Sequence, residues 1–239
     1  MPVNSFDYQV VHFFNQFCRR SELFDRGIVV LVNNTLLKGG VLMILIWFEW
    51  YRPSKDNFTK SQRSKRQHII STLCGCFISM FSVRALTKIL PFRARPILNP
   101  ENHLIPAFGL SDNFVDNTNS FPSDHASLFI GLATGMFFVS RRAGIFSLLY
   151  VVVVVLFPRI YLGWHYPTDI LGGAFLGAFF VSIANMDFFT TSTSEKVLNF
   201  ADTHPEIFYP VFFLLTYQIA TLFEGIRTVG SFILHPYRG

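Results

Sequence analysis

The chain has 239 residues and a mass of 27.4 kDa; 51% of the residues are hydrophobic, 15% are charged, and the formal net charge is +5. A mean hydropathy of +0.38 excludes a disordered chain and is atypical of a soluble domain, because too little polar surface is available to cover an apolar interior of this size. No solenoid repeat or sustained heptad occurs. The composition therefore indicates a membrane protein.

The first 26 residues have the pattern of an amphipathic helix. Large apolar residues recur at helical spacing and are separated largely by polar ones: Phe6, Val10, Phe13, Phe14 and Phe17. The segment lacks the continuous apolar centre of a cleavable signal peptide. We expect residues 1–26 to lie in the membrane interface, with packing against a helix bundle as the alternative, and residues 27–239 to form the membrane domain.

Six stretches with at most one charged residue follow along the chain. They cover residues 27–48, 67–83, 126–140, 143–158, 170–186 and 207–223. Crossing the hydrocarbon core takes about 20 largely apolar residues, which these stretches reach with their amphipathic flanks. A core helix of a soluble protein would explain one such stretch but not six. We therefore predict an all-α, polytopic membrane protein with six transmembrane helices.

Basic residues lie mostly on one side of the predicted membrane. Six of them fall between the first and second stretches: Arg52, Lys55, Lys60, Arg63, Lys65 and Arg66. Cytoplasmic loops carry such an excess, so this loop and the one with Arg141 and Arg142 are expected on the cytoplasmic side. A nucleic-acid-binding role fits a loop tethered to the membrane at both ends less well, and no nucleic acid is expected as a partner.

Polar side chains that suit phosphate chemistry converge on the opposite, outer face. They come from the end of the second stretch, the start of the third and the hairpin between the fourth and fifth: Lys88, Arg93, Arg95, Ser123, Asp124, His125, Arg159, His165 and Asp169. Lys and Arg neutralise phosphoryl oxygens. Ser123 suits the N-cap of a helix, whose first amides would cradle an anion. Asp169 follows His165 by four residues, so its carboxylate is expected to bond one ring nitrogen and leave the other as a nucleophile.

Three motifs within these segments resemble those of a known family. Lys88 is followed after six residues by Arg95-Pro96, residues 122–125 read Pro-Ser-Asp-His, and Arg159, His165 and Asp169 have five and three residues between them. In this order, the three motifs are similar to the signatures of the type 2 phosphatidic acid phosphatase superfamily. The resemblance covers roughly residues 65–187.

The resemblance implies a phosphohistidine mechanism. His165 would attack the terminal phosphorus, Asp169 would orient it, and His125 would protonate the leaving oxygen and later activate water. The remaining motif residues would hold the phosphoryl oxygens: Lys88, Arg95, Ser123, Asp124 and Arg159. The resemblance implies no metal ion and no cofactor.

Two positions depart from the family pattern. Pro158 replaces a usual Ser, which leaves the spacing of Arg159 intact, and Asp124 replaces the usual Gly. A carboxylate beside an anion site repels substrate unless it points away, pairs with an Arg or meets a divalent cation. The Pro-Ser-Asp-His variant resembles that of bacterial undecaprenyl diphosphate phosphatases. This resemblance implies hydrolysis of undecaprenyl diphosphate at the outer face of the bacterial cytoplasmic membrane, in the regeneration of the lipid carrier for cell-wall peptidoglycan.

Several alternatives are compatible with the same residues. The chemistry would also serve phosphatidic acid, phosphatidylglycerol phosphate or lipid A phosphate, and a phosphotransferase would pass the phosphoryl group from a polyprenyl diphosphate to another lipid. A transporter would need the polar cluster only to bind headgroups. Two further features have no assigned role: Lys38 lies inside the first apolar stretch, and the 97–121 loop, with Glu101, His103, Asp112 and Asp116, is a candidate lid. The sequence does not define the oligomeric state.

Overall fold

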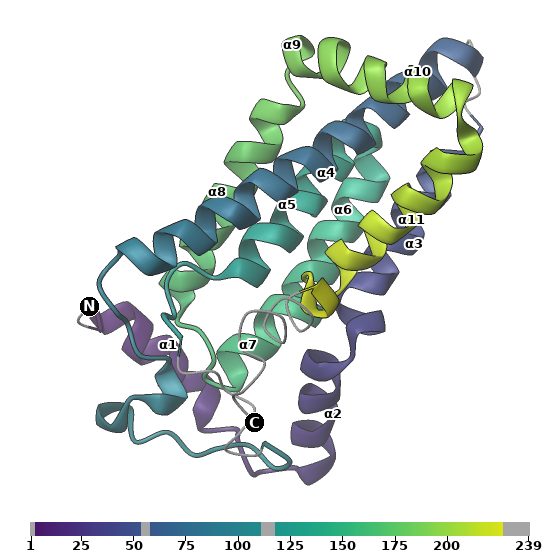
Figure 1. Ribbon diagram of the computed structural model, residues 1–239. Coiled ribbons are helices and arrows are strands. Elements are labelled where there is room, and N and C mark those ends of the chain that lie inside the picture. The colour runs from purple at the N-terminus through teal and green to yellow at the C-terminus, as the bar shows by residue number, and fades with distance from the viewer. Residues whose placement is uncertain (1–2, 54–57, 111–117, 227–239) are drawn as a thin grey trace, which may run out of the picture.

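The computed structural model describes residues 3–53, 58–110 and 118–226, and all regular secondary structure in these ranges is helical (Figure 1). The longer helices are α1 (Ser5–Asn15), α2 (Glu22–Asn33), α3 (Val41–Tyr51), α4 (Phe58–Ile89), α5 (Asp124–Val139), α6 (Arg141–Tyr150), α7 (Phe157–Tyr161), α8 (Pro167–Ala184), α10 (Glu195–Thr203) and α11 (Pro205–Ala220). Shorter elements are η1 (Leu36–Gly40), η2 (Pro96–Leu98), η3 (Pro100–Asn102), η5 (Val151–Leu156), α9 (Asp187–Phe189) and η6 (Thr190–Ser194). The all-α prediction is confirmed. Lys55, Asp112 and Asp116 lie outside the described residues.

Three helices form the centre of the bundle. α4, α5 and α8 pack side by side (Figure 1). α8 presents glycine where it meets α5, since a Cβ atom on Gly177 would lie 2.0 Å from the carbonyl oxygen of Ser127. Small residues allow membrane helices to approach this closely, which increases their van der Waals contact. The glycine is therefore a condition for the contact between α5 and α8.

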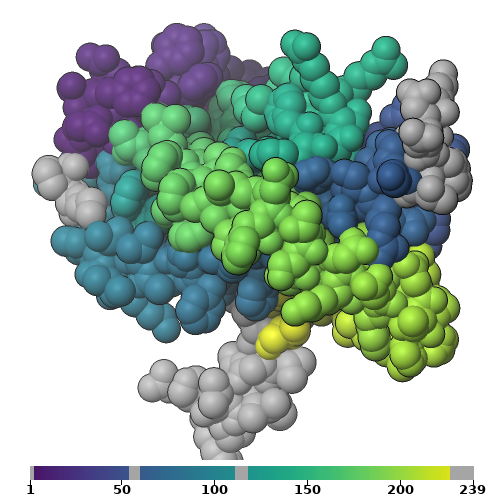
Figure 2. Space-filling view, turned by 90° about the horizontal axis from the view of Figure 1, so that it is seen from above, coloured from purple at the N-terminus to yellow at the C-terminus, as the bar shows by residue number. Residues whose placement is uncertain are grey.

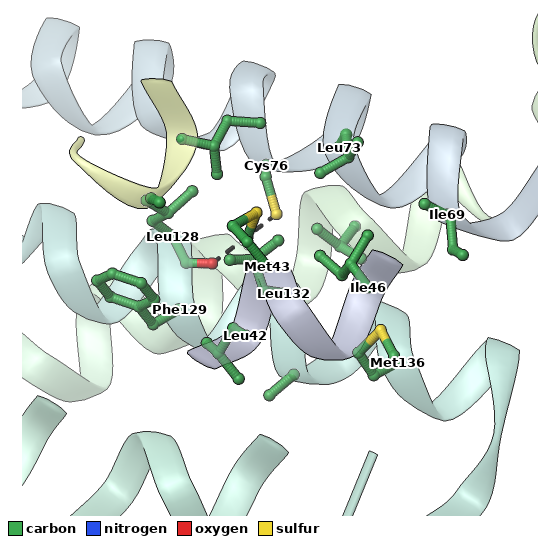
Figure 3. Close-up of a cluster of buried hydrophobic side chains, with 14 of the residues drawn as sticks. Leu42, Met43, Ile46, Ile69, Leu73, Cys76, Leu128, Phe129, Leu132 and Met136 are labelled. Atoms are coloured by element: carbon green, nitrogen blue, oxygen red, sulfur yellow. Dashed lines mark hydrogen bonds between the residues drawn. The ribbon is translucent and has the colours of Figure 1, made fainter. Parts of the chain in front are cut away.

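An apolar cluster joins α3 to this centre. Figure 3 shows the side chains that α3, α4 and α5 contribute: Leu42, Met43, Ile46, Ile69, Leu73, Cys76, Leu128, Phe129, Leu132 and Met136. All of them are buried, and the thiol of Cys76 donates to the carbonyl oxygen of Leu128 at 3.8 Å. The cluster holds α3 against the bundle through packing alone, because it offers few polar groups.

Three helices in the described ranges are long and apolar enough to cross a membrane: Lys60–Ile89, Arg141–Tyr161 and Pro167–Ala184. A fourth span results if α2 and the segment from η1 to α3 count as one. α5 is apolar but has 16 residues, fewer than the about 20 that a perpendicular span requires. The prediction of six transmembrane helices is therefore confirmed only in part.

The first predicted span is not continuous. Its two parts are bent by 68° relative to each other, whereas the hydropathy of residues 27–48 predicted one helix. Asn34 has an extended backbone, with φ −81° and ψ 110°, and its side chain accepts a hydrogen bond from the amide of Leu37 at 3.1 Å. Asn side chains compete with helical hydrogen bonds in this way. The break at Asn34 is followed by the π-helical turn η1.

The helix predicted near the N-terminus is present as α1, and it packs against α7 and α8. Phe6, Phe13 and Phe17 are exposed, as expected for the apolar face of an interfacial helix. Asp7, by contrast, is fully buried. The polar side of α1 is thus turned partly into the protein, which agrees with the bundle-packing alternative.

The end of the bundle formed by the N-terminus of α4 and the C-terminus of α8 is covered by α9 and α10. Figure 2 looks onto this end, where the segment from α9 to α10 lies across the neighbouring helices. Arg63 on α4 forms ion pairs with Glu195 and Asp202 on α10, at 2.8 Å and 2.7 Å. One of the basic residues that indicated a cytoplasmic loop therefore also fastens α10 to α4.

Candidate active site

Three segments meet at the end of the bundle opposite α10: the chain after α4, the N-terminus of α5, and the hairpin between α7 and α8. Ser123 is the N-cap of α5, and its hydroxyl accepts from the amide of Ala126 at 3.3 Å. The amide of Ser123 donates to the carbonyl oxygen of Asp169 at 3.0 Å. This bond ties the first turns of α5 and α8 together.

A tight turn fixes the hairpin between α7 and α8. Gly163 has φ +67°, a conformation that favours glycine. The amides of Trp164 and His165 both donate to the carbonyl oxygen of Arg159, at 2.8 Å and 3.3 Å. Pro167 then begins α8, where its missing N–H has no helical partner to lose. The spacing from Arg159 to His165 is thus the length of one closed turn.

His165 is 3% exposed, and its two ring nitrogens have different partners. Its Nδ1 lies 3.0 Å from the carbonyl oxygen of Ser120, and its Nε2 lies 3.2 Å from Nη1 of Arg95. Because a carbonyl oxygen only accepts and a guanidinium only donates, Nδ1 carries the proton and Nε2 has the lone pair. Burial lowers the pKa of His165 below its usual value, which favours this neutral form.

Asp169 supports His165 differently from the way the spacing predicted. Its carboxylate lies 3.7 Å from Nδ1 of His165, which is beyond hydrogen-bond length. The carboxylate instead accepts from the hydroxyl of Ser120 at 2.5 Å, from the amide of Tyr166 at 2.8 Å and from the guanidinium of Arg93. Asp169 therefore fixes Ser120, whose carbonyl oxygen in turn orients the histidine ring.

A second buried carboxylate, from the N-terminal helix, completes this network. Asp7 accepts from Nη2 of Arg93 at 2.6 Å and from the amide and hydroxyl of Thr168 at 3.0 Å and 2.5 Å. Arg93 thus bridges Asp7 on α1 and Asp169 on α8, and its guanidinium lies over the ring of Tyr166. Buried charges require such pairing. α1 therefore supports the hairpin that carries His165.

His125 and Asp124 form a pair in the first turn of α5. Oδ1 of Asp124 lies 2.8 Å from both the backbone nitrogen and the ring Nδ1 of His125. The carboxylate favours the tautomer with a proton on Nδ1, and it stabilises the imidazolium when the ring is protonated. The substitution of Asp for the usual Gly thus places a negative charge against a histidine.

Arg95 and Arg159 supply the positive charge of the site. Arg95 is half-buried and donates to the carbonyl oxygen of Trp164 at 3.0 Å and to the hydroxyl of Thr118 at 3.1 Å. Arg159 is fully buried and donates through Nη1 to the carbonyl oxygen of Val155, whereas its Nε and Nη2 have no hydrogen-bond partner among the described residues. Unsatisfied donors of a buried cation are costly. An anion such as a phosphoryl group would satisfy them.

The family comparison agrees with this geometry. The model of the PAP2 superfamily matches residues 68–192, slightly more than half of the chain. The chain belongs to the PAP2 superfamily. This is the family that the three motifs resemble, and the matched range contains all of them.

Relatives of the chain have names that describe lipid diphosphate chemistry. The chain is 24% identical over 168 residues to undecaprenyl-diphosphatase BcrC of Bacillus subtilis, a match of 70% of this chain and 76% of that protein. It is 28% identical over 187 residues to lipid A 1-diphosphate synthase of Escherichia coli, covering 73% and 74% of the two chains. It is 29% identical over 116 residues to putative undecaprenyl-diphosphatase YbjG of Escherichia coli, covering 48% and 54%. No solved structure matches the chain.

The structure gathers most of the PAP2 motif residues into one site, with one exception. The residues brought together are Arg95, Ser123, Asp124, His125, Arg159, His165 and Asp169. Lys88 is exposed in the last turn of α4, and its ammonium group forms no hydrogen bond or ion pair with the side chains of other described residues. Its place in the first motif is therefore not matched by a contact in the site.

The sequence did not predict the residues that hold His165 in place. Ser120, Thr168 and Asp7 had no role, and Arg93 was noted only as a member of the polar cluster. No local signal distinguishes Asp7, because a polar residue on an amphipathic helix ordinarily faces solvent. Among the described residues, no group of three or more His, Cys, Asp and Glu side chains is arranged to hold a metal ion.

Proposed function

We propose that this protein is a membrane phosphatase that removes the terminal phosphate of undecaprenyl diphosphate and releases undecaprenyl phosphate. The observation that carries the proposal is the orientation of His165, whose Nε2 lone pair is directed at the guanidinium of Arg95. A phosphoryl group bound by Arg95 would meet this nitrogen. The choice of substrate is supported by Asp124 in the second motif and by the names of the relatives in Bacillus subtilis and Escherichia coli.

In the first step, Nε2 of His165 attacks the terminal phosphorus. The bond from this phosphorus to the bridging oxygen breaks, and the oxygen keeps the electron pair and takes a proton from His125. Asp124 stabilises the protonated form of His125 before the transfer. Arg95, Arg159 and the amides after Ser123 would neutralise the charge on the phosphoryl oxygens. The product is undecaprenyl phosphate and a phosphohistidine.

In the second step, His125 takes a proton from water, and the water oxygen attacks the phosphohistidine. The phosphorus–nitrogen bond breaks, the electron pair returns to Nε2 of His165, and inorganic phosphate leaves. His125 thus acts first as an acid and then as a base. Lys88, exposed at the end of α4, would attract the anionic headgroup from the membrane surface.

The proposal includes a membrane topology. The bundle would have six spans, with α5 and α11 added to the four candidate spans; 16 residues of α helix extend about 24 Å, somewhat less than the about 30 Å of the hydrocarbon core. The end of the bundle that carries Arg52, Arg63 and Arg141 would face the cytoplasm. The site would then open on the outer face of the bacterial cytoplasmic membrane, with the aromatic side of residues 1–26 in the interface. Release of undecaprenyl phosphate there would return the lipid carrier to peptidoglycan synthesis.

A phosphotransferase is the second candidate. Its support is the relative whose name describes synthesis of lipid A 1-diphosphate rather than hydrolysis of a diphosphate. The same phosphohistidine would pass its phosphoryl group to a lipid hydroxyl or phosphate in place of water. Transfer predicts a phosphorylated lipid, which forms only when an acceptor is present, whereas hydrolysis predicts free phosphate without an acceptor.

Phosphate release by the purified protein in detergent tests the proposal. Undecaprenyl diphosphate and phosphatidic acid are offered side by side to the wild type, to His165→Ala and to a control, His204→Ala, whose exposed imidazole lies at the N-terminus of α11. We expect faster release from the diphosphate, near-complete loss in His165→Ala and no change in His204→Ala. An acid-labile phosphoenzyme should form in the wild type and be absent from His165→Ala.

Each other outcome removes a specific part of the proposal. Preference for phosphatidic acid would overturn the substrate and keep the mechanism. Unchanged release by His165→Ala would overturn the nucleophile. A headgroup-binding transporter would retain its activity in the same variant.

A further inference from the structure

A lysine lies beside the break in the first predicted span. This residue, Lys38, belongs to η1 and is half-buried. η1 joins α2 to α3 (Figure 1). Non-α-helical backbone at membrane depth is tolerated where it is buried in protein or lines a polar cavity. π-helical turns inside α helices often occur at functional sites. The conformation of η1 therefore makes Lys38, the residue at its centre, a candidate functional residue.

A second π-helical turn lies directly beside the first. η1 packs against η5, and the hydroxyl of Tyr150 donates to the carbonyl oxygen of Leu37 at 2.5 Å. η5 also contains Val155, whose carbonyl oxygen accepts from Nη1 of Arg159. Lys38 thus lies in one of two neighbouring turns, and Arg159 is hydrogen-bonded to the other.

The ammonium group of Lys38 interacts electrostatically with members of the candidate active site. These interactions are with Arg159, Asp124 and His125, and a further one is with Glu224 beyond α11. Lys38 stands 50 positions before Lys88 and lies outside the range that the PAP2 superfamily model matches. The three motifs therefore give no indication of it.

Two cations close together in a buried site require an anion. Arg159 and Lys38 repel each other, and this repulsion is larger inside a protein than in water. Arg159 is 0% exposed, and its Nε and Nη2 have no hydrogen-bond partner among the described residues. The nearby carboxylate of Asp124 is bonded to His125. A ligand with several anionic oxygens would satisfy both cations.

We propose that Lys38 binds the phosphoryl group that remains with the lipid when a diphosphate headgroup is cleaved. This inference rests on the proposed function, because it assigns the two ends of the site from the roles of the two histidines. Arg95 contacts His165, which marks the side of the attacked phosphorus. Lys38 lies in η1, which packs against η5, and it interacts electrostatically with Asp124 and His125. Because His125 would protonate the leaving oxygen, we place Lys38 on the side of the leaving group.

The position of Lys38 makes it a specificity residue for diphosphates. When the bond to the bridging oxygen breaks, the leaving group of a diphosphate is a second phosphoryl group that gains negative charge. Lys38 would stabilise that charge as it develops. When a lipid monophosphate is cleaved, the leaving group is the lipid alcohol, which has no phosphoryl group at this place. Loss of Lys38 should therefore affect diphosphate substrates and spare monophosphates.

The competing role is a structural ion pair between Lys38 and Glu224 that has no part in binding. Kinetics with farnesyl diphosphate and farnesyl phosphate separate the two roles, using full-length protein in detergent. In Lys38→Met, we expect kcat/KM for the diphosphate to fall about 10- to 100-fold, with the value for the monophosphate within about twofold. Lys38→Arg should retain most of the activity on the diphosphate. Lys196→Met, which removes an exposed lysine on α10, should behave like the wild type.

Two results would overturn the role of Lys38. Equal losses on both substrates in Lys38→Met, reproduced by Glu224→Gln, would identify a structural ion pair. Unchanged kinetics on both substrates would leave Lys38 without a function in the site. Lys38→Gln, which keeps a polar side chain in η1, provides a second variant if the methionine variant does not fold.

Equilibrium binding of phosphonates that the enzyme cannot cleave tests the role of Lys38 without requiring turnover. Titration with methylenediphosphonate and with methylphosphonate should give tighter binding of the diphosphonate to the wild type, and Lys38→Met should lose about tenfold or more of that preference. This result supports Lys38 even if the wild type releases no phosphate, in which case only the proposed hydrolysis fails. Identical binding of the diphosphonate to the wild type and to the variant overturns the inference.

Discussion

Asp7 connects the N-terminal helix to the hairpin between α7 and α8, so its removal should change the position of His165. Asp7→Ala deletes a fully buried carboxylate that binds Arg93 and Thr168. Breaking a buried ion pair costs about 3–5 kcal/mol when the remaining charge is left unpaired. Because Arg93 keeps Asp169 as a second partner, we expect the lower end, a loss of about 3 kcal/mol in the free energy of unfolding.

The expected effect of Asp7→Ala on the reaction rate comes from a change in the position of His165. Without Asp7, Arg93 and Asp169 are free to shift, and with them Ser120, whose carbonyl oxygen orients the ring of His165. A displacement of about 1 Å in a reacting group costs about 100-fold in rate. We expect kcat to fall about 10- to 100-fold, with KM nearly unchanged, because Asp7 does not contact Arg95 or Arg159, the two residues proposed to bind the headgroup.

Thermal unfolding in detergent and steady-state phosphate release measure these two effects. Asp25→Ala is the matched control, since Asp25 is another fully buried carboxylate near the N-terminus. Its partners are the amides of Arg19 and Phe108 and the hydroxyl of Tyr161. The control should lower stability and leave kcat per folded molecule unchanged. An Asp7→Ala protein with the kcat of the wild type would refute the coupling between α1 and His165.

Two further predictions concern packing and protonation. Gly177→Ala should lower stability by about 1–3 kcal/mol or more, because its Cβ would lie 2.0 Å from the carbonyl oxygen of Ser127. The control Gly27→Ala should leave stability unchanged, because no atom lies within 4 Å of a Cβ added there. Equal melting temperatures of the two variants would contradict the close contact of α5 and α8. Burial lowers the pKa of His165, so the ring stays neutral and nucleophilic below its ordinary pKa of about 6.5. The acidic limb of kcat/KM should therefore lie below about pH 6.5, and a limb above that value would contradict burial as the dominant cause.

The sequence by itself determined the class of the protein and the chemical groups of its site. Apolar stretches, the Ser123 N-cap and the spacing from Arg159 to Asp169 act within one segment, so a local pattern predicts them. The three motifs also indicated the family. Even the break in the first helix has a local cause, because Asn34 bonds the amide of Leu37 in place of the helical pattern.

Only the tertiary structure decided which groups hold His165 in place. The carbonyl oxygen of Ser120, rather than the carboxylate of Asp169, lies within hydrogen-bond distance of the ring of His165, and Asp7 binds Arg93 from 86 positions away. Hydropathy and spacing describe one segment and its faces. The partner of a buried charge, however, is supplied by a segment distant in the chain, and a charge is buried only where such a partner lowers the cost of removing it from water. For that reason Asp7 has no signature in the sequence, although it pairs with Arg93 in the folded protein. The apolar stretch around Lys38 marked this residue as unusual, but it did not indicate which groups lie near it.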